Sequence, residues 1–91
     1  MHEAALIDDL MRKIAEVAAR ENAERVTAVR VWLGALSHMS AQHFREHFDH
    51  AAAGGIAEGA RLSTEVSADL DHPDAQRVLL VSVDVEPGRS P

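Results

Sequence analysis

Apolar residues near the start of the chain recur with the 3.6-residue period of an α-helix. From Ala4 to Ala19 they fall in one stripe along a single helical face. That stripe consists of Leu6, Ile7, Leu10, Met11, Ile14, Val17 and Ala18. We therefore expect an amphipathic first helix that buries this face against the rest of the domain.

Three later segments alternate with a period of two, which is typical of half-buried strands. They are Val26 to Gly34, Arg61 to Val66, and Val78 to Val85. In the first segment the residues expected on one side are Val29, Val31 and Leu33. In the last segment the residues expected on one face are Leu79, Val81, Val83 and Val85.

A second helix is expected between the first two strands. Ser40 is a favourable N-cap, because its hydroxyl can accept a hydrogen bond from a backbone amide of the first turn. The helix should run to about Ala53 and stop at Gly54 and Gly55, since glycine readily adopts the left-handed cap conformation. Its expected apolar stripe is Phe44, Phe48 and Ala51.

The element order, α-β-α-β-β, predicts an α/β (α+β) two-layer sandwich, with a small three-stranded mixed sheet and two helices on one face. The first two strands are joined through a helix and should run parallel by a right-handed crossover. The last strand should return antiparallel after the connection from Ser67 to Arg77. Residues 1–86 are expected to form a single domain, followed by a disordered tail at residues 87–91.

The composition narrows the class of protein. The chain has 91 residues, enough for one modest core, and no cysteine, which excludes disulfides, a thiolate nucleophile and a cysteine zinc site. Its net charge of -6 is unfavourable for binding nucleic acid or an anionic membrane surface. Without an apolar span or a secretory leader in the sequence, we expect a soluble, cytoplasmic protein.

The first three residues carry the clearest metal-binding chemistry. Met1, His2 and Glu3 combine a terminal amine, an imidazole, backbone amides and a carboxylate. Planar nitrogen donors of this kind suit square-planar nickel(II) or copper(II), whereas zinc prefers a tetrahedron. The alternative is that the chain begins with these residues by chance.

A second group of possible ligands lies on the predicted second helix. His43, His47 and His50 share one helical face, and His43 and His47 have the i, i+4 spacing of helical metal pairs. The alternative is a solvated polar face that titrates near pH 6.5. A third alternative is adventitious metal binding by these histidines alone.

No catalytic pattern emerges from the sequence, so an enzyme is not expected. Gly54, Gly55 and Gly59 lack the lysine and serine of a phosphate-binding loop. Ser37 precedes His38, but no orienting acid or oxyanion site can be identified for a hydrolase. Trp32 fits either an interface on the outer sheet face or ordinary packing.

The order of elements and several segments resemble the HypA/HybF family of hydrogenase nickel-incorporation proteins. The opening Met-His-Glu looks like the family's nickel motif. The matching segments are residues 25–29, RVTAV; residues 33–37, LGALS; residues 57–62, AEGARL; and residues 78–86, VLLVSVDVE. The resemblance therefore extends over nearly the whole chain and implies a small nickel metallochaperone.

The resemblance also implies ligands and partners. Nickel(II) would be held by Met1, His2 and Glu3, and the partners would be a hydrogenase-maturation GTPase and the hydrogenase large subunit. Family members carry a zinc domain with two CxxC pairs between the second and third strands. Here that interval has no cysteine, so structural zinc is not expected. His72, in the short connection, is a candidate to replace a linker histidine of the family.

One alternative function remains open at this point. A chain without the zinc domain could be a metal-independent adaptor that docks on a hydrogenase or another nickel-enzyme subunit. Such docking would use the outer sheet face or an open edge strand. An open edge also allows either a monomer or a dimer.

Overall fold

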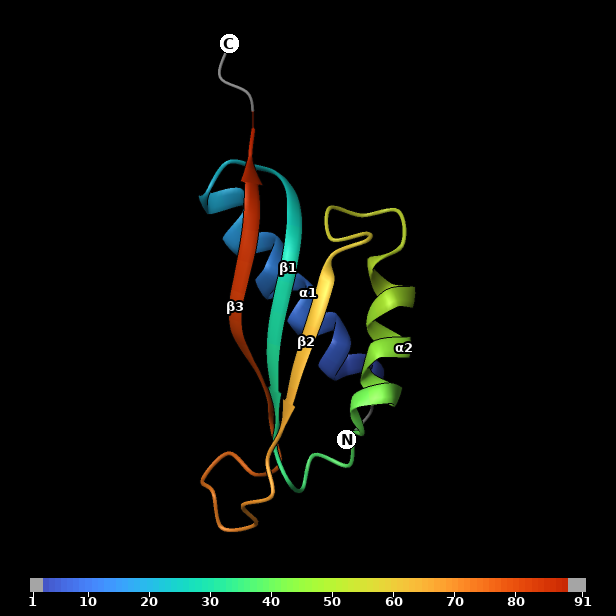
Figure 1. Cartoon of the computed structure of the whole chain (residues 1–91), viewed down its shortest axis with the longest axis vertical. Helices are drawn as coiled ribbons and strands as arrows, with labels where there is room; N and C mark the ends of the chain where they lie inside the picture. The colour runs from blue at the N-terminus through green and yellow to red at the C-terminus, as the bar shows by residue number, and fades with distance from the viewer. Residues whose placement is uncertain (1–2, 89–91) are drawn as a thin grey trace.

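The computed structural model describes residues 3–88, with side chains from Ala5 onward. Five elements follow one another along the chain (Figure 1). They are α1 (Glu3–Arg20), β1 (Ala23–Leu33), α2 (Ala41–Ala52), β2 (Arg61–Val66) and β3 (Val78–Pro87). Their order is the one predicted from the pattern of apolar residues.

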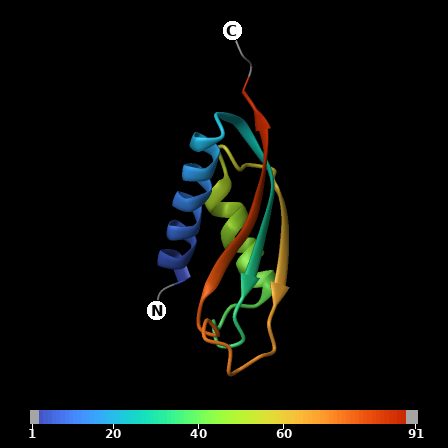
Figure 2. The ribbon, with the colours of Figure 1, turned by 90° about the vertical axis from the view of Figure 1, so that its left-hand side faces the viewer.

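The strands form one sheet in the order β2-β1-β3. β1 runs parallel to β2 and antiparallel to β3, as the connections predicted. Seen from the side, both helices lie on the same face of this sheet (Figure 2). The predicted two-layer sandwich is therefore confirmed, with β1 in the centre and an open edge on each outer strand within residues 3–88.

The core lies between the helices and the sheet. Its buried apolar residues are Ile7, Leu10, Ile14, Ala18, Val26, Val29, Val31, Leu33, Met39, Phe44, Phe48, Ala52, Ala57 and Leu62. The predicted stripes of α1 and β1 are thus largely confirmed. On α2 the stripe was wrong at one position, because Ala52 is buried and Ala51 is exposed. Ala52 lies four residues after Phe48, on the same face, which places it over the sheet.

The predicted face of β3 was wrong at the start of the strand, because β3 contains a β-bulge. Arg30 pairs with Ser82 and Val31 with Leu80, so Val81 is an extra residue between two pairs. An extra residue reverses the alternation of side chains on either side of it. Val83 and Val85 face the core as expected. Toward the start of the strand, however, the side chains that pack against the core are Val78 and Leu80.

One end of the antiparallel β1–β3 pair, where β1 begins and β3 ends, extends further than predicted. β1 begins at Ala23, and Arg25 forms an ion pair with Glu86 of β3 across 3.3 Å. β3 includes Pro87, and the Gly88 amide donates a hydrogen bond to the Asn22 carbonyl at 2.9 Å. The antiparallel partner thus supplies hydrogen bonds to segments that show no apolar alternation of their own.

Tight turns terminate the helices where glycine or asparagine allows it. Gly54 follows α2 with a φ of 79°, which confirms the predicted helix stop. Asn22 takes a φ of 51° after α1 and reverses the chain into β1. Within the part of the chain that the structure describes, no helix is long and apolar enough to cross a lipid bilayer.

Candidate functional site

The predicted amino-terminal chelate lies mostly outside the described residues. Met1 and His2 precede them, and Glu3 is the first residue of α1, with no side chain described. The start of α1 lies at the same end of the molecule as the start of α2, as both views show (Figures 1 and 2). The ligand set of Met1, His2 and Glu3 therefore stays a prediction.

The start of α2 is positioned by its cap. Ser40 has extended backbone angles, with φ −79° and ψ 158°, and its hydroxyl accepts a hydrogen bond from the His43 amide at 3.1 Å. Phe44 and Phe48 then anchor the helix in the core with exposed fractions of 0% and 1%. Because these two rings fix the rotation of α2, the residues just before each of them are fixed beside the buried face.

His43 and His47 are those two residues, and their side chains meet. Their Nε2 atoms lie 2.8 Å apart, and their ring planes are within 13° of parallel. The ring centroids are 4.7 Å apart, much further than the nitrogens. The rings therefore approach through their Nε2 edges rather than through their faces. His43 is exposed, whereas His47 is half-buried.

His50 does not join this contact. With Glu46 and His47 it lines a surface pocket of about 250 Å³ one turn further along α2. The structure thus divides the three predicted histidines into a close pair and a neighbour. The i, i+4 spacing indicated the pair from the sequence, but the ring orientations come only from the structure.

His72 lies elsewhere, on the face of the sheet opposite the helices. Its ring packs against Trp32 with centroids 4.8 Å apart, and its Nδ1 accepts a hydrogen bond from the Asp74 amide at 2.9 Å. Val31 and Leu33, on either side of Trp32, point into the helix-covered core, so Trp32 points the other way. An acceptor Nδ1 also assigns the proton of the neutral ring to Nε2. As a nickel ligand, His72 remains a prediction that this contact does not support.

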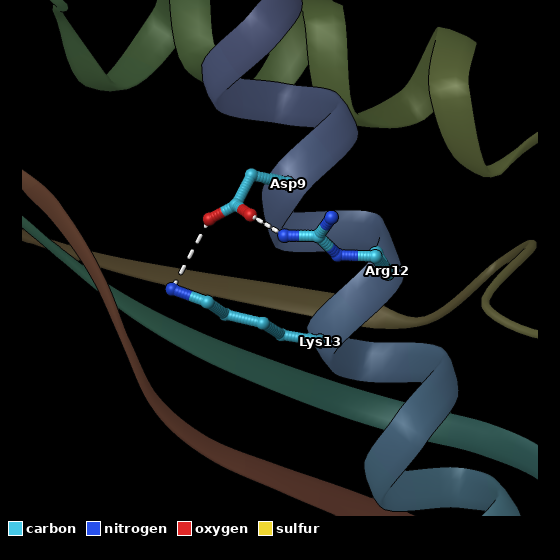
Figure 3. A network of polar contacts seen from close by, with 3 residues as sticks. All are labelled: Asp9, Arg12 and Lys13. Carbon is cyan, nitrogen blue, oxygen red and sulfur yellow. Dashed lines mark hydrogen bonds and ion pairs between the residues drawn. The ribbon is translucent and has the colours of Figure 1, made fainter.

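Asp9 on α1 lies in an ion-pair network with two basic residues of the same helix (Figure 3). Asp9 contacts Arg12 and accepts a hydrogen bond from Lys13 at 3.1 Å. The hydrogen bond from Lys13, together with the charges of Lys13 and Arg12, lowers the pKa of the Asp9 carboxyl below its usual value of 3.8. Both oxygens are thus engaged by cations on the same helix, which favours a surface ion pair over a metal ligand.

Other constellations provide no further site in residues 3–88. No group of three or more His, Asp or Glu side chains converges there as a metal site would require. The Ser37 hydroxyl is buried and has no hydrogen-bond partner among the described residues, so His38 does not act on it as a base. The close pair of His43 and His47 is therefore the clearest arrangement of ligand atoms on the described surface.

Comparisons with known proteins identify relatives of this chain. A family model described as "Hydrogenase/urease nickel incorporation, metallochaperone, hypA" matches residues 1–70. The hydrogenase maturation factor HypA of Methylocella silvestris is 36% identical over 66 residues, which are 72% of this chain and 58% of that protein. The corresponding protein of Thermococcus gammatolerans is 43% identical over 65 residues, which are 71% of this chain and 47% of that protein.

The fold is also shared with a solved structure. The solution structure of the Ni metallochaperone HypA from Helicobacter pylori superposes with a TM-score of 0.82 at 17% identity, covering 97% of this chain and 100% of that chain. At this identity the likeness concerns the fold. The matched regions span about half the length of the curated relatives. Because the family model matches residues 1–70, the chain belongs to the HypA family of hydrogenase/urease nickel-incorporation metallochaperones.

Proposed function

We propose that this chain is a nickel metallochaperone that binds nickel(II) at its amino terminus and delivers it during maturation of a nickel-iron hydrogenase. The observation that carries the proposal is the reach of the family match, which begins at residue 1 and so includes the Met1-His2-Glu3 motif. The two curated relatives above are named as hydrogenase maturation factors. Nickel is cargo in this function, and no catalytic step is required.

The chemistry of the motif fits nickel cargo. The Met1 amine, the His2 imidazole and nearby backbone amides are nitrogen donors that can lie in one plane around nickel(II), with Glu3 in support. Each donor must lose its proton before it binds, so nickel affinity falls in acid. Ordinary reference pKa values are about 7.7–8.0 for an amine and about 6.5 for an imidazole, so protons compete with nickel for these donors from about pH 8 downward.

The position of the motif fits delivery. Glu3 opens α1, and α1 is anchored in the core through Ile7, Leu10 and Ile14. In sequence, the proposed ligands thus come directly before the anchored part of α1 and at its first residue. A site at a chain end is also easier to dismantle than a closed cage of four side chains.

The partners that the family implies are a maturation GTPase and the hydrogenase large subunit, and they are part of this proposal. The net charge of -6 favours protein partners over nucleic acid. The open edges of β2 and β3 and the helix-free sheet face are the surfaces on which such partners could dock.

A calorimetric nickel titration of the untagged chain, with Met1 verified by mass spectrometry, tests the proposal. We expect one nickel per chain, weaker zinc binding, and at least about a tenfold loss of nickel affinity in His2→Ala. A single glycine added before Met1 moves the terminal amine away from His2 and should weaken binding similarly. His50→Gln is the matched control and should bind as the parent chain does. Absence of saturable nickel binding would refute the chaperone and favour the metal-independent adaptor.

A further inference from the structure

Within residues 3–88 both helices cover one face of the sheet, and the other face is turned toward the viewer in Figure 1. In the second half of β1, alternate residues from Val29 to Leu33 point into the core. The residues between and before them therefore lie on the helix-free sheet face. They are Ala28, Arg30 and Trp32. Because β1 is the central strand, these side chains run along the middle of that face.

The register of the strands brings two arginines together on this face. Arg30 lies between Ser63 of β2 and Ser82 of β3. Arg61 of β2 is opposite Ala28, two residues along from Arg30. With strands about 4.8 Å apart and about 3.3 Å per residue, the Cα atoms of the two arginines are about 8 Å apart. Both side chains are exposed, so their guanidinium groups can contact the same carboxylate or two neighbouring ones.

These two arginines are unpaired. Within residues 3–88, Arg30 and Arg61 form neither an ion pair nor a side-chain hydrogen bond, and the same is true of Arg20 on α1. The other described basic side chains have partners; they are Arg12, Lys13, Arg25, Arg45 and Arg77. Neighbouring like charges on a sheet are destabilising, and a bound carboxylate would replace this repulsion with attraction.

Trp32 and a neighbouring pocket add apolar surface beside the arginines. Trp32 is half-buried, two residues along β1 from Arg30, and packs against His72. His72 also lines a surface pocket of about 480 Å³. Leu36 and Leu70 line the same pocket and are 37% and 62% exposed. Tryptophan and arginine are enriched at the centres of protein interfaces, so this combination is typical of a protein-binding surface.

The charges on this face select the class of partner. A second copy bound face to face across a two-fold axis near Arg30 would bring the arginines of both copies together, which is repulsive. Nucleic acid is unfavourable because the net charge is -6 and because Glu65 and Asp84 lie on the same face, opposite Trp32 and Ala28. A protein segment with acidic and apolar side chains complements both the arginines and the pocket.

We infer that the helix-free sheet face binds an extended segment of a partner protein. Acidic side chains of that segment contact Arg30 and Arg61, and an apolar side chain packs against Trp32 and the pocket beside His72. The inference rests on the proposed function, which requires a partner protein, and it names the surface and the chemistry of that contact.

Chemical-shift titration of the 15N-labelled full chain with synthetic peptides at low salt tests the inference. One peptide carries two glutamates, a short Gly/Ser spacer and a leucine, and its reversed sequence samples the opposite binding direction. Two matched peptides carry glutamine in place of glutamate. The variants are Arg30→Ser, Arg61→Ser and the double variant. Arg20→Ser is the matched control, because Arg20 is also unpaired but lies on α1. Circular dichroism establishes that each variant is folded.

We expect an acidic peptide, in one of the two directions, to shift the amide signals of Arg30 and Arg61 and the indole signal of Trp32. It should bind more tightly than its glutamine counterpart. Each single variant should weaken binding by about two- to fivefold and the double variant by about four- to twentyfold, with no change in Arg20→Ser. Equal binding of the glutamine peptide, equal binding by the double variant, shifts confined to other surfaces, or no binding would refute the inference.

Nickel calorimetry of the same double variant separates this inference from the proposed function. Its nickel affinity should equal that of the parent chain, because neither arginine belongs to the proposed ligand set. A chain that binds nickel but no acidic peptide would refute only the inference. A chain that binds the acidic peptide but no nickel would refute the chaperone function and assign the same face to the metal-independent adaptor.

Discussion

The turn that follows β1 depends on the absence of a side chain at Gly34. A β-carbon at this position would lie 2.2 Å from the Ala75 carbonyl oxygen and 2.7 Å from the Asp74 carbonyl oxygen. Both obstacles are backbone atoms of the connection at residues 67–77, so no rotamer change can relieve them. Gly34→Ala must therefore push this connection away from β1 by about 1 Å to reach an ordinary contact distance.

Such a displacement breaks the hydrogen bonds that hold the connection. The Gly34 amide donates to Arg77 at 2.9 Å, and the Leu36 amide donates to Ala75 at 2.7 Å. Each such bond contributes about 0.5–1.5 kcal/mol, and a buried amide left without a partner costs about 1–3 kcal/mol. The lower entropy of an unfolded chain with alanine offsets about 0.4–1 kcal/mol. We expect a net loss of about 2–3 kcal/mol in the free energy of unfolding.

Urea unfolding followed by the fluorescence of Trp32 and by circular dichroism measures this loss. In thermal unfolding it corresponds to a decrease in Tm of about 10–20 °C for a domain of this size. Gly55→Ala is the matched control, because its β-carbon would meet the nearest atom, the Ala52 carbonyl oxygen, at an ordinary 3.5 Å. If Gly34→Ala loses no more stability than Gly55→Ala, the packing of residues 67–77 against β1 is not as described.

Three further predictions concern the core, the cap of α2 and the ion pairs of α1. Phe44 is 0% exposed, so Phe44→Ala should lower the free energy of unfolding in urea by about 3–5 kcal/mol, whereas the exposed Val81→Ala should change it by less than about 0.5 kcal/mol. Ser40→Ala removes the hydroxyl that accepts from the His43 amide and should cost about 1 kcal/mol, with Ser40→Asp, which restores an acceptor, as the variant that recovers it. The pKa of Asp9 is lowered in the folded chain, so its ion pairs stabilise the fold above pH 3.8 and this contribution is lost as the pH falls through the lowered value. Thermal unfolding between pH 5 and pH 2 should therefore show a shallower acid loss in Asp9→Asn than in the parent chain, and equal curves for the two would contradict this assignment.

The arrangement of the elements could be predicted because local patterns carry it. The period of the apolar residues distinguished the helices from the strands, and the helix between β1 and β2 required a parallel pair. Ser40 and Gly54 marked the ends of α2 through chemistry that acts within a few residues. The Met1-His2-Glu3 motif was likewise visible as a set of adjacent donors.

Contacts between distant residues could not be predicted in this way. Val81 is an extra residue in β3 because of how that strand pairs with β1, and the apolar alternation of β3 does not indicate a bulge there. From the sequence, His72 was a candidate nickel ligand. In the structure its ring packs on Trp32, which lies forty residues earlier in the chain.

The sequence by itself determined the elements, their order and the nitrogen-rich start of the chain, since each depends on residues within one turn or one strand. Only the tertiary structure decided which of the α2 histidines meet, on which side of the sheet His72 lies, and that α1 and α2 begin at the same end. Those features depend on packing between elements far apart in the chain.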